Sequence, residues 1–261
     1  MGSAIVLLPL TALALYLGGF VFAIVVGIVF ALAYREWETM VTREPLTTFG
    51  GALIGLVAVS AVVFPLWGWM GSAAVIVIAA LLGLSLGGEG RIWRGAGLAF
   101  FGLVIVSLLA LRGNTVDGIW AGVYLGFVVW MTDSAAFFAG RQIGGEKLAP
   151  DISPSKTWSG ALGGLALGTI AGTVVWIFTT SSPWYIGTGF AILVSIFGQV
   201  GDLTESAIKR RFRIKDSGDI IPGHGGLMDR LDSLTFGAIL VFLIGLLHLG
   251  YGNVAAGLLH W

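Results

Sequence analysis

The sequence predicts an all-α, polytopic integral membrane protein, and three observations support this fold class. Of the 261 residues, 57% are hydrophobic, and the mean hydropathy is +0.95. Only 11% are charged, whereas about 25% is usual for a soluble domain. Long apolar stretches recur along the chain, and most are close to the roughly 17–25 residues that a helix needs to cross a bilayer. The composition therefore excludes an ordinary soluble domain.

We expect about nine transmembrane helices, with eight as the alternative. The first apolar run, from Ala4 to Tyr34, is too long for one upright helix, and Gly18 and Gly19 divide it into two. The first of these helices should remain in the mature protein, because it lacks the basic start of a cleavable signal peptide. The remaining apolar stretches cover residues 49–66, 70–87, 95–111, 119–140, 159–180, 183–200 and 233–258.

The distribution of Lys and Arg predicts the orientation of these helices. If nine helices alternate, one side of the membrane receives 13 of the 14 cations, and only Arg112 remains on the other. Cytoplasmic loops carry the excess of Lys and Arg, so we expect the cation-rich side to be cytoplasmic. We also expect the protein to lie in the inner (plasma) membrane of a bacterium. The cation-rich loops lie near residues 35–48, 88–94, 141–158 and 201–232.

The C-terminal half carries the longer of these loops. We therefore divide the chain into N-terminal transmembrane helices, residues 1–118, and a catalytic transmembrane half, residues 119–261. The cytoplasmic loops of the catalytic half are 141–158 and 201–232. The active site should lie at the cytoplasmic side of this half.

A stripe of glycines marks the helix that follows Trp158. Glycines at every fourth position fall on one helix face and let two helix backbones approach closely. We expect this stripe to serve helix packing rather than substrate binding. Its members are Gly160, Gly164, Gly168 and Gly172.

Acidic residues within or beside the transmembrane stretches are the first candidates for a functional site, because charge in a membrane is costly and usually functional. Asp133 lies inside an apolar stretch, eight residues before Arg141, which corresponds to roughly 12 Å along a helix. A structural ion pair is the alternative for Asp133. Asp202 ends a later stretch, and Glu205 three residues on shares its helix face.

The most polar part of the chain is Lys215–Asp232, with the sequence KDSGDIIPGHGGLMDRLD. The preceding KRRFRIK holds five cations in seven residues, which alone would fit a face that binds lipid headgroups. The Gly and Pro residues exclude a continuous helix and let backbone N–H groups approach an anion. Asp229 and Asp232 follow, and carboxylates suit Mg²⁺. We interpret this combination as a site for nucleotide phosphates and a metal ion.

This part of the chain resembles the signature of the phosphatidate cytidylyltransferases, also called CDP-diacylglycerol synthases. Ser206–Asp232 satisfies every fixed position of the pattern S-x-x-K-R-x4-K-D-x-G-x2-x-P-x-H-G-G-x-x-D-R-x-D. The segments GDLTES and TDSAAFFAGR…SPSKTWSG look like two further family blocks. The family usually has SPKKTWEG, with Lys and Glu where this chain has Ser155 and Ser159. We therefore assign no role to these two serines.

The resemblance implies a nucleotidyltransferase of phospholipid biosynthesis, which transfers CMP from CTP to phosphatidate and releases CDP-diacylglycerol and pyrophosphate. The attacking lipid phosphate is largely dianionic near neutral pH, so no general base is required. The barrier is electrostatic, and metal ions with Lys and Arg clamps lower it. The implied cofactor is Mg²⁺, with K⁺ as a second ion in some members. The implied partners are CTP, phosphatidate, membrane lipids and a second copy of the chain, without nucleic acid.

The resemblance also assigns roles to residues. The metal ligands are a dyad of Asp202 and Asp229, with Asp133 and Asp232 in or beside the same centre. His224 either contacts the nucleotide or fixes the loop by a hydrogen bond, whereas His248 and His260 have structural roles. The implied catalytic residues are Asp202, Asp229, Lys215, Asp216 and His224. The implied substrate-binding residues are Lys156, Lys209, Arg210, Gly225, Gly226 and Arg230.

Two other classes of protein are the alternatives. Another nucleotide-dependent lipid-phosphate enzyme, such as a polyprenol kinase, would also bring a nucleotide to a membrane lipid. Such a kinase would release a nucleoside diphosphate rather than pyrophosphate, which separates the two reactions. A transporter would show inverted repeats with interrupted helices at mid-membrane, and the two halves of this sequence contain no corresponding pair of interrupted segments.

Overall fold

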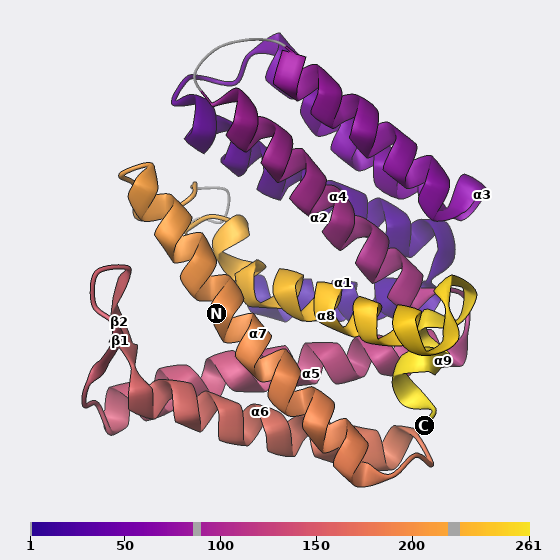
Figure 1. Ribbon diagram of the computed structural model, residues 1–261, viewed down its shortest axis with the longest axis vertical. Coiled ribbons are helices and arrows are strands. Elements are labelled where there is room, and N and C mark those ends of the chain that lie inside the picture. Colours follow the sequence, from indigo (N-terminus) through magenta and orange to yellow (C-terminus); the bar gives the residue numbers. More distant parts are fainter. Residues whose placement is uncertain (1, 86–89, 219–224) are drawn as a thin grey trace. The chain divides into compact units, whose positions relative to one another are not determined.

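The computed structural model describes residues 2–85, 90–218 and 225–261, and these residues are almost entirely helical (Figure 1). Seven of the helices are long and apolar enough to cross a membrane. The chain is therefore a multi-pass membrane protein, and the predicted all-α class is confirmed. The seven helices are α2 (Gly19–Thr42), α3 (Thr48–Ser85), α4 (Arg91–Arg112), α5 (Val116–Gln142), α6 (Trp158–Thr179), α7 (Trp184–Arg211) and α8 (Asp232–Leu249).

Several shorter elements complete the described chain. Helix α1 precedes α2, a two-stranded hairpin joins α5 to α6, and one short 3-10 helix lies on each side of α8. These elements are α1 (Gly2–Leu17), β1 (Lys147–Ala149), β2 (Ser153–Thr157), η1 (Met228–Arg230), η2 (Tyr251–Asn253) and the final helix α9 (Val254–Leu259).

The helices form two compact units. The first unit contains residues 1–114, with helices α1 to α4, together with the segment Asp216–Asp229. The second unit contains residues 115–215 and 230–261, with helices α5 to α9 and the hairpin. The polar signature stretch is thus shared between the units, and its described residues 216–218 and 225–229 belong to the first unit.

In the first unit, the chain breaks between α1 and α2 at Gly18, as predicted. The backbone of Gly18 has φ 62 and ψ −156, a conformation that residues with a Cβ rarely adopt. Arg112 of α4 donates hydrogen bonds to the carbonyl oxygens of Leu15 and Tyr16. Carbonyl groups at a helix end lack partners within the helix, so this buried cation stabilises the end of α1.

Helix α3 is a helical hairpin rather than a straight rod. Gly68 interrupts it with φ 64 and ψ −160. The Oγ of Ser72 donates to the carbonyl oxygen of Ser60 at 2.7 Å, whereas a straight helix would separate residues twelve positions apart by about 18 Å. The two arms of α3 agree with the separate stretches predicted over residues 49–66 and 70–87.

Helices α2 and α4 are joined by a buried ion pair. The Nη2 of Arg94 lies 2.7 Å from Oε1 of Glu38, and its Nε lies 3.0 Å from both carboxylate oxygens. The Tyr34 hydroxyl donates to the same carboxylate at 3.2 Å. Because removal of one partner would leave a buried charge unpaired, this pair contributes to the stability of the first unit.

In the second unit, α5 and α6 pack at short range along the glycine stripe. All four glycines of the stripe are buried. A Cβ added to Gly164 would lie 2.7 Å from the carbonyl oxygen of Thr132, and one added to Gly168 would lie 2.0 Å from Thr132 Oγ1. The predicted packing role of the stripe is confirmed.

The hairpin of β1 and β2 was not predicted from the sequence. Its strands pair antiparallel, with Lys147 opposite Thr157 and Ala149 opposite Ser153. The Oγ1 of Thr157 then accepts a hydrogen bond from the N–H of Gly160 at 3.1 Å and caps α6. Strands of three and five residues are too short for an alternating pattern to predict them.

The prediction of one continuous span over residues 233–258 was wrong. Gly250 has φ 79 and ends α8, and the chain then folds back into α9. A Cβ added to Gly257 would lie 2.3 Å from the carbonyl oxygen of Gly245, so these glycines allow the two helices to touch. The Nδ1 of His248 donates a hydrogen bond at 2.9 Å to the carbonyl oxygen of Gly257, and its ring stacks on Trp261, which agrees with a structural role.

Candidate active site

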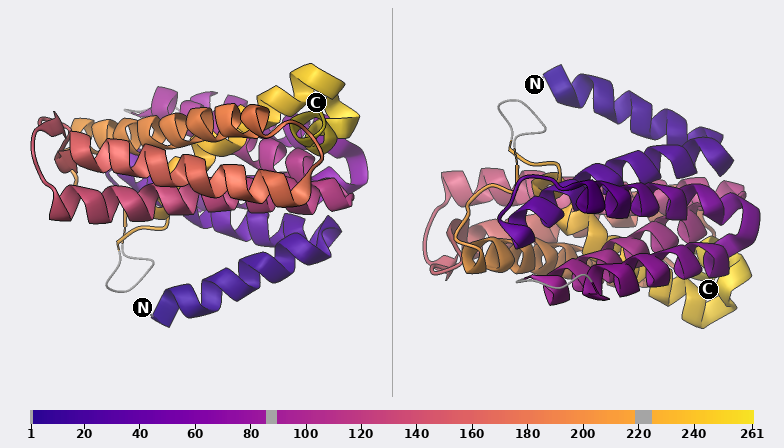
Figure 2. Two further views of the ribbon diagram at one scale, coloured as in Figure 1. Left: turned by 90° about the horizontal axis from the view of Figure 1, so that it is seen from below. Right: turned by 90° about the horizontal axis from the view of Figure 1, so that it is seen from above.

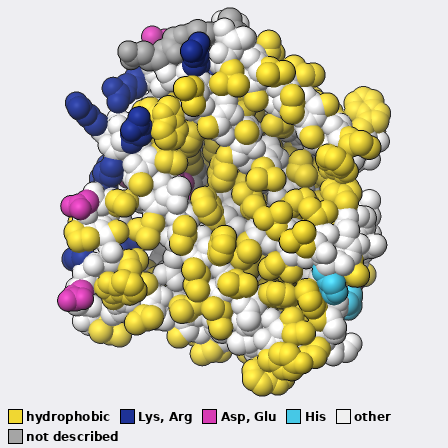
Figure 3. Space-filling model, in the orientation of Figure 1, with side chains coloured by type: hydrophobic (Ala, Val, Ile, Leu, Met, Phe, Trp, Pro, Cys, Tyr) yellow, Lys and Arg dark blue, Asp and Glu magenta, His cyan; other side chains and the backbone are white. Residues whose placement is uncertain are grey.

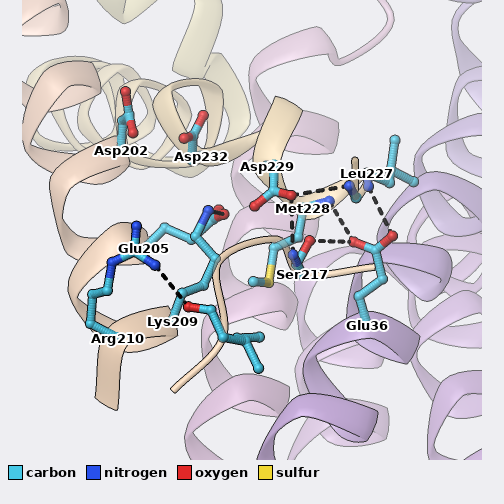
Figure 4. A network of polar contacts seen from close by, with 12 residues as sticks. Glu36, Asp202, Glu205, Lys209, Arg210, Ser217, Leu227, Met228, Asp229 and Asp232 are labelled. Atoms are coloured by element: carbon cyan, nitrogen blue, oxygen red, sulfur yellow. Dashed lines mark hydrogen bonds and ion pairs between the residues drawn. The ribbon is translucent and has the colours of Figure 1, made fainter. Parts of the chain in front are cut away.

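The second unit contains an acidic cluster, which we define as Asp133, Asp202 and Asp232. Asp202 and Asp232 lie on α7 and α8, and these helices approach closely beside Gly201. A Cβ added to Gly201 would lie 2.7 Å from the carbonyl oxygen of Asp232. Figure 4 shows that the side chains of Asp202 and Asp232 lie side by side. The absence of a side chain at Gly201 therefore brings the two carboxylates together.

Asp133 of α5 joins this cluster through Ser233. The Oγ of Ser233 donates to Oδ1 of Asp133 at 3.1 Å, and its backbone N–H donates to Oδ1 of Asp232 at 2.7 Å. Asp133 and Asp202 both interact electrostatically with Asp232. Three of the four predicted metal ligands, from three different helices, are thus neighbours.

Lys156 is the cation paired with this cluster. It lies at the end of β2 and forms an ion pair with Oδ2 of Asp202. The nearby Glu205, which also interacts with Asp232, is itself paired with Lys209 at 3.1 Å. Lys156 thus places a positive charge beside the carboxyl groups of the acidic cluster.

The donor chemistry of the acidic cluster fits Mg²⁺. In the part of the chain that the structure describes, no three carboxylate or imidazole groups converge closely enough to enclose a metal ion by themselves. Mg²⁺ does not need such a cage, because it usually takes one or two carboxylates and completes its shell with water and substrate phosphates. The neighbouring carboxyl groups of the acidic cluster, which come from three helices, match this requirement.

In the first unit, the segment Asp216–Asp229 is organised around two carboxylates (Figure 4). The Oδ2 of Asp229 accepts hydrogen bonds from the N–H groups of Ser217, at 3.1 Å, and Gly226, at 3.0 Å. The carboxylate of Glu36, on α2, accepts from Ser217 Oγ and from the N–H groups of Leu227 and Met228, each at 2.9 Å. The ends of the segment are therefore held together and held to α2.

The glycine-rich turn uses its backbone donors on anions, as the sequence suggested, but these anions belong to the protein. The N–H of Gly226 binds Asp229, and the next two N–H groups bind Glu36. Gly225 has φ 80, a conformation that favours glycine. A role of Gly225 and Gly226 in binding substrate phosphates stays a prediction.

The cations predicted to bind phosphates have different environments. Lys209 is buried and paired with Glu205. Arg210 donates from Nε to the carbonyl of Ile152 at 3.2 Å and from Nη1 to that of Ile214 at 3.0 Å. In Figure 3, Lys and Arg side chains gather near the carboxyl end of α7, beside a largely hydrophobic surface. Three further predicted residues are exposed, namely Lys215, Asp216 and Arg230.

Two parts of the predicted site stay predictions. His224 lies outside the described residues. The proposed dyad, which combines Asp202 of the second unit with Asp229 of the first, is the second of these parts. By contrast, Lys156 and the acidic cluster are brought together within one unit.

Glu36 was not predicted from the sequence as a site residue. Its signal was a carboxylate near the end of an apolar helix, which is the same signal that identified Asp133. The adjacent Arg35 made Glu36 resemble an ordinary charge at a water boundary. Its partners are about 180 to 190 positions away in the chain, so the sequence did not indicate what it binds.

The fold and these sites define a multi-pass helical membrane protein with a polar centre suited to cations and phosphates. The comparison with known proteins is more specific: the chain belongs to the cytidylyltransferase family, whose sequence model matches residues 1–248.

Relatives from three bacteria illustrate this membership. A phosphatidate cytidylyltransferase of Brucella suis biovar 1 is 38% identical over 261 residues, which cover 93% of this chain and 91% of that protein. One of Haemophilus influenzae is 33% identical over 280 residues, which cover 89% of this chain and 93% of that protein. One of Bacillus subtilis is 38% identical over 151 residues, which cover 58% and 55% of the two chains.

Proposed function

We propose that this protein is a phosphatidate cytidylyltransferase, which transfers CMP from CTP to phosphatidate and forms CDP-diacylglycerol and pyrophosphate. The observation that carries the proposal is the match along 93% of the chain to proteins of that name. Such a reaction needs groups that bind a metal ion and phosphates. The acidic cluster beside Lys156 and the neighbouring cations can supply them.

The reaction joins an oxygen of the lipid phosphate to the α-phosphorus of CTP. The bond between that phosphorus and the oxygen bridging to the β-phosphate breaks, and pyrophosphate leaves with the electron pair. Both reactants are anions, so positive charge must offset their repulsion. We assign this role to Lys156, Lys215 and Arg230, with contributions from Lys209 and Arg210. No side chain needs to remove a proton, because the attacking phosphate is already ionised.

Mg²⁺ is the proposed cofactor. Asp202 and Asp229 would hold it, with Asp133 and Asp232 beside them, and K⁺ could occupy a second position in the same centre. When bound, the metal would offset charge on the reacting phosphates and on the leaving pyrophosphate. The ion pair of Lys156 with Asp202 orients this carboxylate within the acidic cluster.

The proposed location is the inner membrane of a bacterium, with the loops that carry 13 of the 14 Lys and Arg residues in the cytoplasm. If both arms of α3 cross the membrane and α1 does so as well, the seven spanning helices become the nine that we predicted. CTP would enter from the cytoplasm, whereas phosphatidate would keep its acyl chains in the bilayer. A homodimer belongs to the same proposal.

Transfer of label from CTP into lipid tests the proposed function. Purified protein in detergent would be supplied with phosphatidate, Mg²⁺ and α-labelled CTP. We expect label in the lipid fraction from CTP but not from ATP, GTP or UTP, and we expect EDTA to abolish it. Lipid label from a γ-labelled nucleotide would instead indicate a kinase. Absence of lipid label from α-labelled CTP, with folded protein, would contradict the proposal.

Substitution of Lys215 by Ala tests the proposed phosphate clamp. Lys215 is exposed, so the substitution should leave folding unchanged. Loss of one charge-assisted contact to a phosphate is expected to raise the KM for CTP about tenfold, with a smaller effect on kcat. The matched control is Arg91→Ala, which removes an exposed cation at the start of α4. An unchanged KM for Lys215→Ala would exclude this lysine from the clamp.

A further inference from the structure

Glu36 is a buried carboxylate whose described partners all belong to the signature segment. Glu36 is only 3% exposed. An ionised carboxylate in such a place is stable only when several donors satisfy it. Oε1 accepts from the N–H of Leu227, and Oε2 accepts from the N–H of Met228 and from the hydroxyl of Ser217. Both oxygens are therefore used to hold the segment against α2.

The glycines of the segment are shaped to this carboxylate. A Cβ added to Gly218 would lie 2.9 Å from Oε1 of Glu36, and a Cβ added to Gly226 would lie 2.6 Å from Oε2. Distances below 3.0 Å require some atom to move. The described ends of the segment can thus pack against Glu36 because these two positions lack side chains, which explains why Gly218 and Gly226 are glycine.

The same contacts hold Asp229. Ser217 donates its hydroxyl to Glu36 and its backbone N–H to Asp229. Met228, whose N–H binds Glu36, directly precedes Asp229. Displacement of the segment from Glu36 would therefore move a proposed metal ligand together with Lys215 and Asp216, which lie just before Ser217.

We propose that Glu36 is a positioning residue for the cytidylyl transfer. From α2 it holds the backbone turn that carries Asp229 in the shape that the reaction requires. This inference rests on the proposed function for its catalytic part, but the anchoring of the segment by Glu36 can be tested without any activity. According to this inference, the N-terminal helix α2 helps to position the proposed metal ligand Asp229.

The decisive variant is Glu36→Gln, which keeps the size of the side chain but offers one acceptor oxygen instead of two. Its NH₂ group would also face an N–H or O–H group that itself needs an acceptor. We expect kcat to fall about 100-fold, because hydrogen bonds to a buried charged group contribute a large free energy and their loss would let the turn that carries Asp229 move. The thermal unfolding midpoint in detergent should change little, since the contacts of α2 with α4 remain.

Glu38→Gln is the matched control on the same helix. Glu38 is 2% exposed, but it pairs with Arg94 rather than with the signature segment. We expect this control to lower the thermal midpoint and to keep the kcat of the folded fraction. If both variants lose kcat equally, or only as far as they lose folded protein, Glu36 has a structural role alone and the proposal is wrong.

Limited digestion with trypsin reports on the segment independently of activity. Lys215 and Arg230 flank it and are exposed cleavage sites. Release of the segment from α2 should speed cleavage at these sites about tenfold in Glu36→Gln but not in Glu38→Gln. Unchanged cleavage would overturn the anchoring role. Faster cleavage in a protein whose wild type transfers no label would refute the proposed function and leave the anchor intact.

Ser217→Ala provides a coupling test, because it removes one of the three donors to Glu36. Alone, it should lower kcat by about fivefold to tenfold. Added to Glu36→Gln, it should lower kcat only slightly further, since both substitutions remove the same hydrogen bond. If kcat of the double variant falls by the product of the two single effects, the two residues act separately, and this result would contradict the proposal. A rise in kcat for Glu36→Gln would contradict it as well, because Glu36 would then compete with substrate for these donors.

Discussion

Asp202→Asn is expected to lower kcat at least about 1000-fold in protein that still folds and inserts. Asn has nearly the shape of Asp but lacks its charge, so the close packing of α7 on α8 beside Gly201 should persist. The substitution removes the partner of Lys156 and one carboxylate of the proposed metal centre. The measurement is transfer of α-label from CTP to lipid at saturating Mg²⁺, with thermal unfolding as the test of folding.

Two further variants make this prediction specific. Asp117→Asn removes a carboxylate of the same unit that pairs with His260 at 3.1 Å, and it should keep the wild-type rate. Lys156→Met combined with Asp202→Asn restores the balance of charge without restoring a metal ligand, and it should remain inactive. Normal activity in Asp202→Asn would remove this residue from the metal centre. Recovery in the double variant would show that charge balance, not metal binding, was lost.

Gly168→Val is expected to have the largest effect on stability. Even a Cβ at this position would lie 2.0 Å from Oγ1 of Thr132, and that hydroxyl already donates to Ser195 at 2.9 Å. The larger side chain would therefore push α6 away from α5 along the stripe. We expect the thermal midpoint in detergent to fall by about 5–10 °C, with a lower yield of monodisperse protein.

Gly126→Val on the neighbouring helix α5 is the matched control. A Cβ added to Gly126 would meet nothing within 4 Å, so the same change of residue should leave the thermal midpoint near that of the wild type. If Gly168→Val were as stable as this control, the close approach of α5 and α6 would not contribute to the fold. A midpoint lowered equally in both variants would point to the helix propensity of Val rather than to packing.

Much of the fold could be predicted because a bilayer allows few structures. Backbone groups in lipid must be satisfied within a helix or a closed barrel, so hydropathy and length place most helices. The break at Gly18 was predicted because the apolar run from Ala4 to Tyr34 is too long for one span, and the two stretches predicted over residues 49–66 and 70–87 lie on either side of Gly68. The end of the last span was not predicted, because Gly250 and the short helix α9 lie in sequence that is as apolar as a helix that continues.

The acidic cluster could be predicted in part. Asp133 and Asp202 were selected because charge in or near a membrane is costly, and Asp232 because it ends the polar signature stretch; the structure brings the three together within one unit. The link from Asp133 to Asp232 through Ser233 was not foreseen, because a serine near a helix start has many possible partners. The hairpin that places Lys156 was missed because its strands are short.

By itself, the sequence determined that the chain is a helical membrane protein and that its glycine stripe joins two helices, and it predicted most of the carboxylates of the acidic site. These properties follow from composition and from spacing along single helices. Only the tertiary structure decided that the two described ends of the signature segment bind Glu36 and that the N–H groups of residues 226–228 bind the protein's own carboxylates. The reason is physical: a backbone N–H binds whichever acceptor the fold brings near, and for Met228 that acceptor lies 192 positions away in the chain.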